Sequence, residues 1–203
     1  MIHKLSASIA NRWVERGIVQ SENVENYIFG LQLVLSGLIN FAVPIGLSIC
    51  LGVPAAWIPF MLSFVLLRMT AGGVHAKTQW QCILIFCSVY GVSLFLARQL
   101  ESSVQFMGLL SIAIFCMVVV LLISPVPATN KPLTAHQSKR NRTISVFLAG
   151  AFLLPAFFMK KASFSYTFYV VQFYLGELSA VLSLIWAKVQ GRTAGYVVPF
   201  RSE

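Results

Sequence analysis

The sequence predicts an all-α polytopic membrane protein: a six-helix transmembrane bundle, N-in/C-in, preceded by an N-terminal amphipathic interfacial helix. Apolar residue types make up 58% of the 203 residues and charged types 10%, whereas soluble domains carry about 25% charged residues. The mean hydropathy is +0.80. So little charge cannot cover a water-facing surface, and so apolar a chain is not disordered. Four cysteines are too few for a disulfide scaffold. Residues 1–203 are therefore expected to form a single transmembrane domain.

Six apolar segments account for the predicted spans. They cover residues 27–51, 54–69, 80–97, 104–123, 144–159 and 162–187. The second and fifth are shorter than the roughly 20 residues that a straight span needs, so local thinning of the bilayer or support from neighbouring helices is expected there. Asn40 and Pro44 in the first span predict a kink or an interhelical hydrogen bond.

The distribution of basic residues predicts the orientation. With a cytoplasmic N-terminus, twelve Lys and Arg residues lie inside and three outside. The twelve are Lys4, Arg12, Arg16, Arg68, Lys77, Lys131, Lys139, Arg140, Arg142, Lys188, Arg192 and Arg201, and the three are Arg98, Lys160 and Lys161. This asymmetry favours an N-in, C-in arrangement. Because the net charge of +9 is scattered over short loops, it does not indicate a nucleic-acid partner.

Residues 1–26 are expected to be an amphipathic interfacial segment. Polar residues interrupt the stretch throughout, which is not the pattern of a signal peptide. Apolar residues recur at spacings of three and four, at Ile2, Leu5, Ile9 and Trp13, which is typical of a helix lying in the membrane interface. Two interpretations stay open: a juxtamembrane anchor, or a docking surface for a partner helix.

Residues 68–82, between the second and third predicted spans, contain the best candidates for catalytic side chains. His75 is followed seven residues later by Cys82. A free thiol has a pKa near 8.5 and is mostly protonated at cytosolic pH. A neighbouring imidazolium favours the thiolate and supplies a general acid for a leaving amine. The pair therefore indicates a candidate cysteine nucleophile with its base, on the cytoplasmic side.

The spacing of this pair also constrains the backbone. On an ideal helix, seven residues span about 10.5 Å along the axis, whereas proton transfer needs contact at about 3 Å. We therefore predict a broken or re-entrant helix between Gly72 and Gln79, with the glycine pair permitting a sharp turn.

Two stretches resemble the accessory gene regulator B (AgrB) family of membrane cysteine endopeptidases. The first is Arg68-x-x-x-Gly72-Gly73-x-His75-Ala76-Lys77-x-x-x-x-Cys82. The second is Ser124-Pro125-Val126-Pro127-Ala128-Thr129-Asn130-Lys131-Pro132-Leu133, within a Pro-rich, basic cytoplasmic loop over residues 124–142. The family often has an acidic residue near position 128, where this chain has alanine. Chain length, six spans and two cytoplasmic termini are also similar.

The resemblance implies an enzyme of quorum sensing in the Gram-positive cell membrane. Its substrate would be a short signal propeptide of the AgrD type, cleaved near its C-terminus through an acyl-thioester on Cys82. His75 would act as base and acid, and a Cys or Ser of the peptide would then close a thiolactone or lactone ring. Neither ATP, a metal nor a cofactor is implied, and the resemblance points to a homodimer.

Four further residues are candidate supporting groups. Arg68 is either a donor to an oxyanion or substrate carboxylate or a positive-inside flank, and Lys77 has the same two interpretations. Gly73 is expected to allow the backbone geometry next to His75. Glu177 is an acid inside a span, where a charge costs at least about 2.5 kcal/mol. Glu177 could line the peptide chamber, orient a base or pair with Arg68. Alternatively, it is a protonated group that hydrogen-bonds a neighbouring span.

Two other classes of protein stay open. One is a small transporter or channel that uses Glu177 as an intramembrane proton or cation site. The other is a non-enzymatic membrane scaffold. A zinc site is not expected, because the cytoplasmic loops lack a second clustered pair of ligands.

Overall fold

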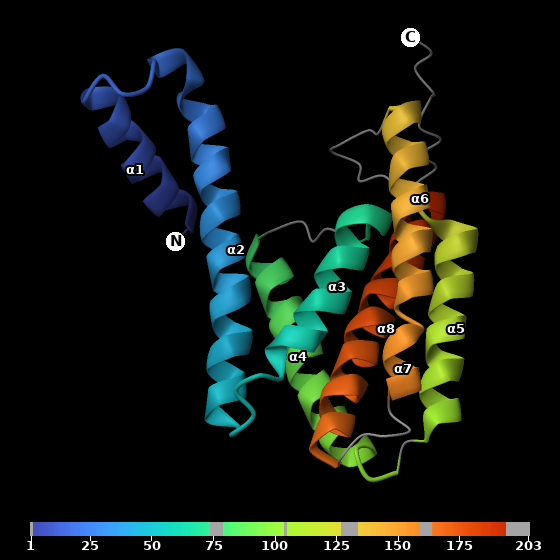
Figure 1. Ribbon diagram of the computed structural model, residues 1–203. Coiled ribbons are helices and arrows are strands. Elements are labelled where there is room, and N and C mark those ends of the chain that lie inside the picture. The colour runs from blue at the N-terminus through green and yellow to red at the C-terminus, as the bar shows by residue number, and fades with distance from the viewer. Residues whose placement is uncertain (1, 74–78, 104, 127–133, 159–163, 194–203) are drawn as a thin grey trace.

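The computed structural model describes residues 2–73, 79–103, 105–126, 134–158 and 164–193, and every regular element in these ranges is a helix. The elements are α1 (Ile2–Glu15), the short 3-10 helix η1 (Ser21–Asn23), α2 (Val24–Cys50), α3 (Trp57–Ala71), α4 (Gln79–Leu100), α5 (Phe106–Ile123), α6 (Ala135–Ala151), α7 (Leu154–Phe158) and α8 (Phe164–Thr193). Figure 1 shows α3 to α8 as one bundle, with α1 and α2 standing beside it.

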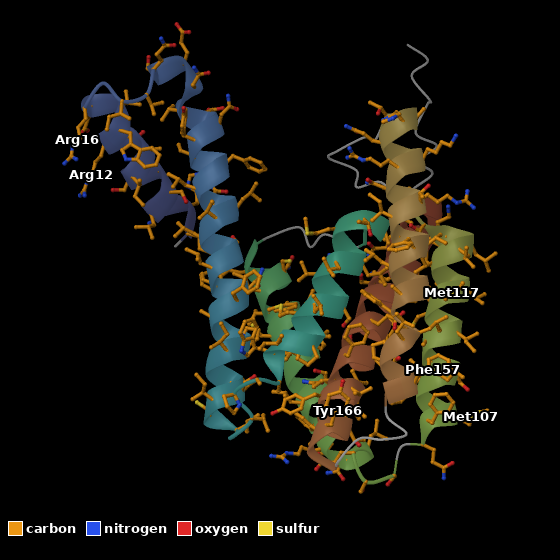
Figure 2. All side chains as sticks on the ribbon, in the orientation of Figure 1. Arg12, Arg16, Met107, Met117, Phe157 and Tyr166 are labelled. Carbon is orange, nitrogen blue, oxygen red and sulfur yellow. The ribbon has the colours of Figure 1, made fainter. Side chains whose placement is uncertain are left out.

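Within the described ranges, four helices are long and apolar enough to cross a membrane, which bears out a polytopic helical membrane protein. They comprise Ser21–Cys50, Trp80–Leu100, Phe106–Ile123 and Tyr166–Gln190, while Trp57–Ala71 is apolar but shorter. Large apolar side chains are exposed on the outer faces of these helices; Met107 of α5, for example, projects away from the bundle (Figure 2). The count of six spans stays a prediction.

Helix α8 is the centre of the bundle and packs on α3, α4 and α5. Its closest approach is to α3 at Gly176, where a Cβ atom would overlap Ser63 and lie 2.6 Å from the carbonyl oxygen of Phe60. At the same crossing, the Ser63 hydroxyl donates a hydrogen bond of 2.7 Å to the Phe173 carbonyl. A residue without a side chain lets the two backbones approach closely, so α3 and α8 are held at a fixed relative position.

The loop predicted before the fifth span is partly helical. Helix α6 begins at Ala135, so residues 135–142 are helical rather than part of a loop over 124–142. The Thr134 hydroxyl accepts a hydrogen bond from the Gln137 N–H, and the Gln137 side chain accepts one from the Thr134 N–H, both at 3.2 Å. This reciprocal cap begins a helix independently of hydrophobicity, which is why the apolar pattern did not locate it.

The same span is also not one helix over 144–159. Helix α6 ends at Ala151 and α7 begins at Leu154, because the ring of Pro155 clashes with the carbonyl four residues earlier, that of Ala151. The Tyr174 hydroxyl of α8 fills the break. It donates to the Phe152 carbonyl and accepts from the Ala156 N–H, each at 2.9 Å. Those two backbone groups would bond each other in a continuous helix.

Replacing Tyr174 by phenylalanine is expected to destabilise the bundle by about 1–2 kcal/mol, because it removes both of these hydrogen bonds inside an apolar environment. The measurement is the melting temperature of the detergent-purified protein. Tyr27→Phe, on the exposed face of α2, is the control and should melt like the parent. An unchanged melting temperature in Tyr174→Phe would mean that the two backbone groups pair directly without the hydroxyl.

The predicted N-terminal helix is present as α1 and packs against α2. Its buried residues are Ile2, Ser6 and Ala10, and Leu5 is 52% exposed, so the contact face is offset from the expected apolar stripe. Arg12 and Arg16 project away from α2 (Figure 2). The location of α1 at a membrane interface stays a prediction.

Candidate functional site

A tight turn ends α3 within the stretch that the sequence singled out. The N–H of Gly72 donates to the carbonyl of Arg68 at 3.1 Å, and Gly72 and Gly73 have φ values of 89° and 152°. Residues with a Cβ rarely adopt such angles, so the glycine pair permits the turn. Helix α3 ends at Ala71, so the predicted break is confirmed at its Gly72 end; the described part of α4 starts at Gln79. His75 and Lys77 lie outside the described residues.

The turn returns the backbone over the Arg68 side chain. One guanidinium nitrogen of Arg68 donates a 2.6 Å hydrogen bond to the Ser183 hydroxyl of α8, and that hydroxyl donates to the Ala180 carbonyl at 2.9 Å. The guanidinium carbon lies 5.7 Å from the centre of the Phe64 ring, which is within cation–π range. A Cβ on Gly73 would overlap this guanidinium and lie 2.7 Å from the Ser183 hydroxyl oxygen. Arg68 is thus held by α3, α8 and the glycine turn together.

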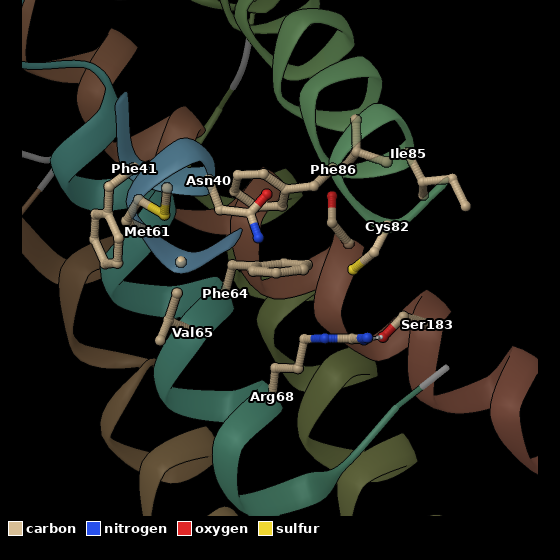
Figure 3. Close-up of a pocket in the computed structure, with 13 residues that line it drawn as sticks. Asn40, Phe41, Met61, Phe64, Val65, Arg68, Cys82, Ile85, Phe86 and Ser183 are labelled. Atoms are coloured by element: carbon tan, nitrogen blue, oxygen red, sulfur yellow. Dashed lines mark hydrogen bonds between the residues drawn. The ribbon is translucent and has the colours of Figure 1, made fainter. Parts of the chain in front are cut away.

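Cys82 lies in the first turn of α4 and is half-buried. It faces the same cavity as Arg68 and Ser183 (Figure 3), so a thiolate at Cys82 would be attracted to the Arg68 guanidinium. A positive charge beside a sulfur nucleophile can stabilise an anion formed there. The structure therefore brings together two of the predicted site residues, Arg68 and Cys82, from different helices.

The cavity itself has a volume of about 310 Å³ and lies between α2, α3, α4 and α8. Its lining residues are Gly37, Asn40, Phe41, Met61, Phe64, Val65, Arg68, Cys82, Ile85, Phe86, Val89, Ser179 and Ser183. Figure 3 shows Arg68, Ser183 and Cys82 toward one side, with Ile85 beside Cys82, and Phe41, Met61 and Asn40 toward the other. A small set of polar groups in an otherwise apolar pocket is typical of a ligand site.

Sequence reasoning missed Ser183 and Ser179 as parts of this site. Both serines are on α8, more than a hundred residues after Arg68 in the sequence, and no motif includes them. The available signal was indirect, since a guanidinium at membrane depth needs a hydrogen-bond acceptor from a neighbouring helix.

The two stretches that carry the family resemblance also meet in space. The Val126 N–H donates to the Ala71 carbonyl at 2.9 Å, and Gly72 pairs with Val126 in an isolated parallel bridge. A Cβ on Gly72 would overlap the Val126 carbonyl. The start of the proline-rich segment is therefore fixed against the turn after Arg68. Its residues 127–133 are outside the described ranges.

Glu177 is not brought into the cavity. It is buried in α8, near Cys116 of α5, and it is not a lining residue. Neither of its carboxyl oxygens has a hydrogen-bond partner within the described part of the chain. A role for Glu177 at the Cys82 site stays a prediction.

Comparison with known proteins identifies the family of the chain. The family model for accessory gene regulator B matches residues 3–187. The chain is 25% identical over 132 residues to the accessory gene regulator protein B of Staphylococcus carnosus (strain TM300), covering 65% of this chain and 68% of that protein. It is 30% identical over 115 residues to protein FsrB of Enterococcus faecalis (strain ATCC 47077 / OG1RF), covering 54% and 47% respectively.

A third relative is the accessory gene regulator protein B of Staphylococcus aureus (strain bovine RF122 / ET3-1), at 27% identity over 122 residues. The match covers 59% of this chain and 63% of that protein, so the chain spans less than two thirds of this relative and of FsrB. No solved structure matches the chain significantly. Because the family model matches nearly the whole chain, the resemblance in the sequence is confirmed: the chain belongs to the accessory gene regulator B (AgrB) family.

Proposed function

We propose that this protein is a membrane cysteine endopeptidase of quorum sensing that removes the C-terminal tail of an AgrD-like signal propeptide and cyclises the remainder. One observation carries the proposal: Cys82 and Arg68 face a single apolar cavity at the break between α3 and α4, in a chain of the AgrB family. A nucleophile, a fixed cation and a water-poor cavity are what acyl transfer to a thiol needs.

The proposed reaction has two steps. The Cys82 thiolate attacks the scissile carbonyl carbon, the peptide C–N bond breaks, and His75 gives a proton to the leaving amine. The acyl group is then held as a thioester on Cys82. A thiol or hydroxyl within the same peptide attacks the thioester carbon, gives its proton to His75 and releases the Cys82 sulfur. Because the attack is intramolecular it has a high effective concentration, and the thioester makes ATP unnecessary.

Arg68 is proposed to stabilise the oxyanion of both steps. Its guanidinium is held by the Ser183 hydroxyl and lies against Phe64, so it needs little reorganisation as negative charge develops. The apolar walls would limit hydrolysis of the thioester by excluding water.

Gly73→Ala tests this role of Arg68. The added Cβ would push the guanidinium aside, and we expect the cleavage rate to fall about 10²-fold, as when an oxyanion donor is lost. Gly52→Ala is the matched control. Gly52 also has a positive φ, 72°, but a Cβ there meets nothing within 4 Å. Equal losses in both variants would assign the effect to backbone strain rather than to Arg68.

The proposed topology has six spans with both termini in the cytoplasm and α1 at the inner interface. The start of α2, the end of α3 and the start of α6 lie at the same end of the molecule (Figure 1). The basic residues at this end are Arg12 of α1, Arg16 just after α1, and Lys139 and Arg140 of α6, as the positive-inside rule requires of the cytoplasmic face. The site at Cys82 would then open to the cytoplasm.

The direct test is capture of the thioester. The purified protein is incubated with a synthetic propeptide that is short, amphipathic, cysteine-containing and acid-tailed. We expect the tail to be released and the protein mass to rise by the acyl fragment, with the adduct on Cys82 and removable by neutral hydroxylamine. Tail release without any adduct on Cys82 would contradict the covalent route.

A small proton- or cation-coupled transporter is the second candidate, and one observation favours it: the buried Glu177 carboxyl has no hydrogen-bond partner in the described ranges. Glu177→Gln separates the two functions. The endopeptidase predicts that Glu177→Gln cleaves the propeptide at the parent's rate. The transporter predicts instead that Glu177→Gln loses a transport current, in a protein whose parent form does not cleave the propeptide.

A further inference from the structure

From Cys82 of α4 the cavity continues between α2, α3 and α8. Beyond Arg68 and Ser183 its walls are formed by Phe41 of α2, Phe64 of α3 and Phe86 of α4 (Figure 3). Its volume of about 310 Å³ is at the lower end of the range for ligand pockets. This space suits one large side chain and its adjoining backbone, not a folded peptide.

One wall of the cavity is set back at Gly37. Gly37, Asn40 and Phe41 recur at spacings of three and four, so they share one face of α2, and all three line the cavity. A Cβ built on Gly37 meets nothing within 4 Å. The depth of the cavity at this wall therefore depends on residue 37 having no side chain.

Asn40 adds a polar group to the same wall. Its Oδ1 atom is buried and has no hydrogen-bond partner in the part of the chain that the structure describes. An unsatisfied buried acceptor is costly, and an extended peptide bound in the cavity carries backbone N–H groups that can satisfy it. The predicted interhelical hydrogen bond of Asn40 is thus not made by this atom.

We propose that this cavity is the pocket for the residue on the acyl side of the scissile bond, that it selects a large apolar side chain, and that Gly37 sets its depth. The inference rests on the proposed function. The acyl part stays bonded to Cys82 and must be shielded from water until the ring closes, which the apolar walls provide. The released tail must leave to water, where the exposed basic residues Lys139 and Arg140 lie.

The test uses three acetyl-dipeptide chloromethyl ketones that end in Ala, Leu or Phe. The Cys82 sulfur displaces chloride from the ketone methylene, so a C–S bond forms, the C–Cl bond breaks and chloride leaves. The rate of alkylation at Cys82 is followed by mass spectrometry of the digested protein, which separates Cys82 from Cys50, Cys87 and Cys116. Iodoacetamide is the small reagent that does not need the pocket.

In the parent protein the Leu and Phe reagents are expected to react about tenfold or more faster than the Ala reagent, as apolar pockets discriminate by such factors. Gly37→Leu should lower the Leu and Phe rates about tenfold, while the Ala and iodoacetamide rates change little. Gly30→Leu is the matched control. Gly30 lies two turns earlier on α2, also has no neighbour within 4 Å of a Cβ, and is not a lining residue; its variant should keep the parent's rates.

Asn40→Leu should slow all three peptide reagents alike and leave iodoacetamide unaffected. Equal rates for the three reagents in the parent protein, or an unchanged preference in Gly37→Leu, would overturn the pocket. If Gly37→Leu lowers the yield of folded protein, Gly37→Ala can be measured in the same way, because its added side chain is smaller.

The pocket and the proposed function fail through different results. If the parent protein cleaves the propeptide but shows no preference for side-chain size, only the pocket is wrong. If the Cys82→Ala variant still cleaves the propeptide, the proposed cysteine endopeptidase function is wrong.

Discussion

Cys82→Ala is expected to abolish tail release from the propeptide, a loss on the order of 10⁴-fold or more, because no other group can form the acyl intermediate. His75→Ala should reduce the rate by about 10²- to 10⁴-fold, the usual contribution of a general acid and base. Cys82→Ser should retain at most a slow reaction and accumulate an oxyester. The measurement is tail release from a co-expressed propeptide, quantified by mass spectrometry.

Cys87→Ala is the matched control for this experiment. Cys87 lies on α4 as Cys82 does, but it does not line the cavity, so its removal should leave cleavage unchanged. Full cleavage by Cys82→Ala would end the cysteine endopeptidase proposal. Cleavage that survives in His75→Ala alone would leave Cys82 as the nucleophile and assign the proton transfers to another group.

Gly176→Ala is expected to have the largest effect among the structural variants. The added methyl group would overlap Ser63 and the backbone of Phe60, and backbone cannot move aside as a flexible side chain can. Overpacking of this kind costs about 1–3 kcal/mol. Because Arg68 of α3 bonds to Ser183 of the same α8, separating the two helices should also lower the cleavage rate.

The measurements are the melting temperature in detergent and the cleavage rate of the same preparation. Gly46→Ala in α2 is the control, since a Cβ there meets nothing within 4 Å; its melting temperature should stay the same or rise slightly, as alanine favours a helix. A Gly176→Ala variant that melts and cleaves like the parent would show that α3 and α8 are not tightly packed at this crossing.

The sequence alone was sufficient for the class of protein and for the local position of the candidate site. Low charge and high hydropathy excluded a soluble protein, because burial in lipid depends on composition. The glycine pair after Arg68 predicted a helix break, since left-handed backbone angles favour glycine wherever they occur. The turn lies where it was expected, at Gly72 and Gly73.

The helix boundaries around the fifth segment could not be predicted from hydrophobicity. Thr134 and Gln137 begin α6 through a polar cap. The break between α6 and α7 is set by Pro155, and the Tyr174 hydroxyl stabilises it from α8. None of these features depends on the distribution of apolar residues.

Only the tertiary structure decided which helix faces form the cavity. Ser183 reaches Arg68 from 115 residues away, and Gly37 and Asn40 join the same cavity from α2. Membrane helices are apolar on nearly all sides, so they lack the amphipathic stripe that marks the inward face of a helix in a soluble protein. The inward faces here are selected by close packing at Gly176 and by hydrogen bonds between helices, which no single segment of the sequence contains.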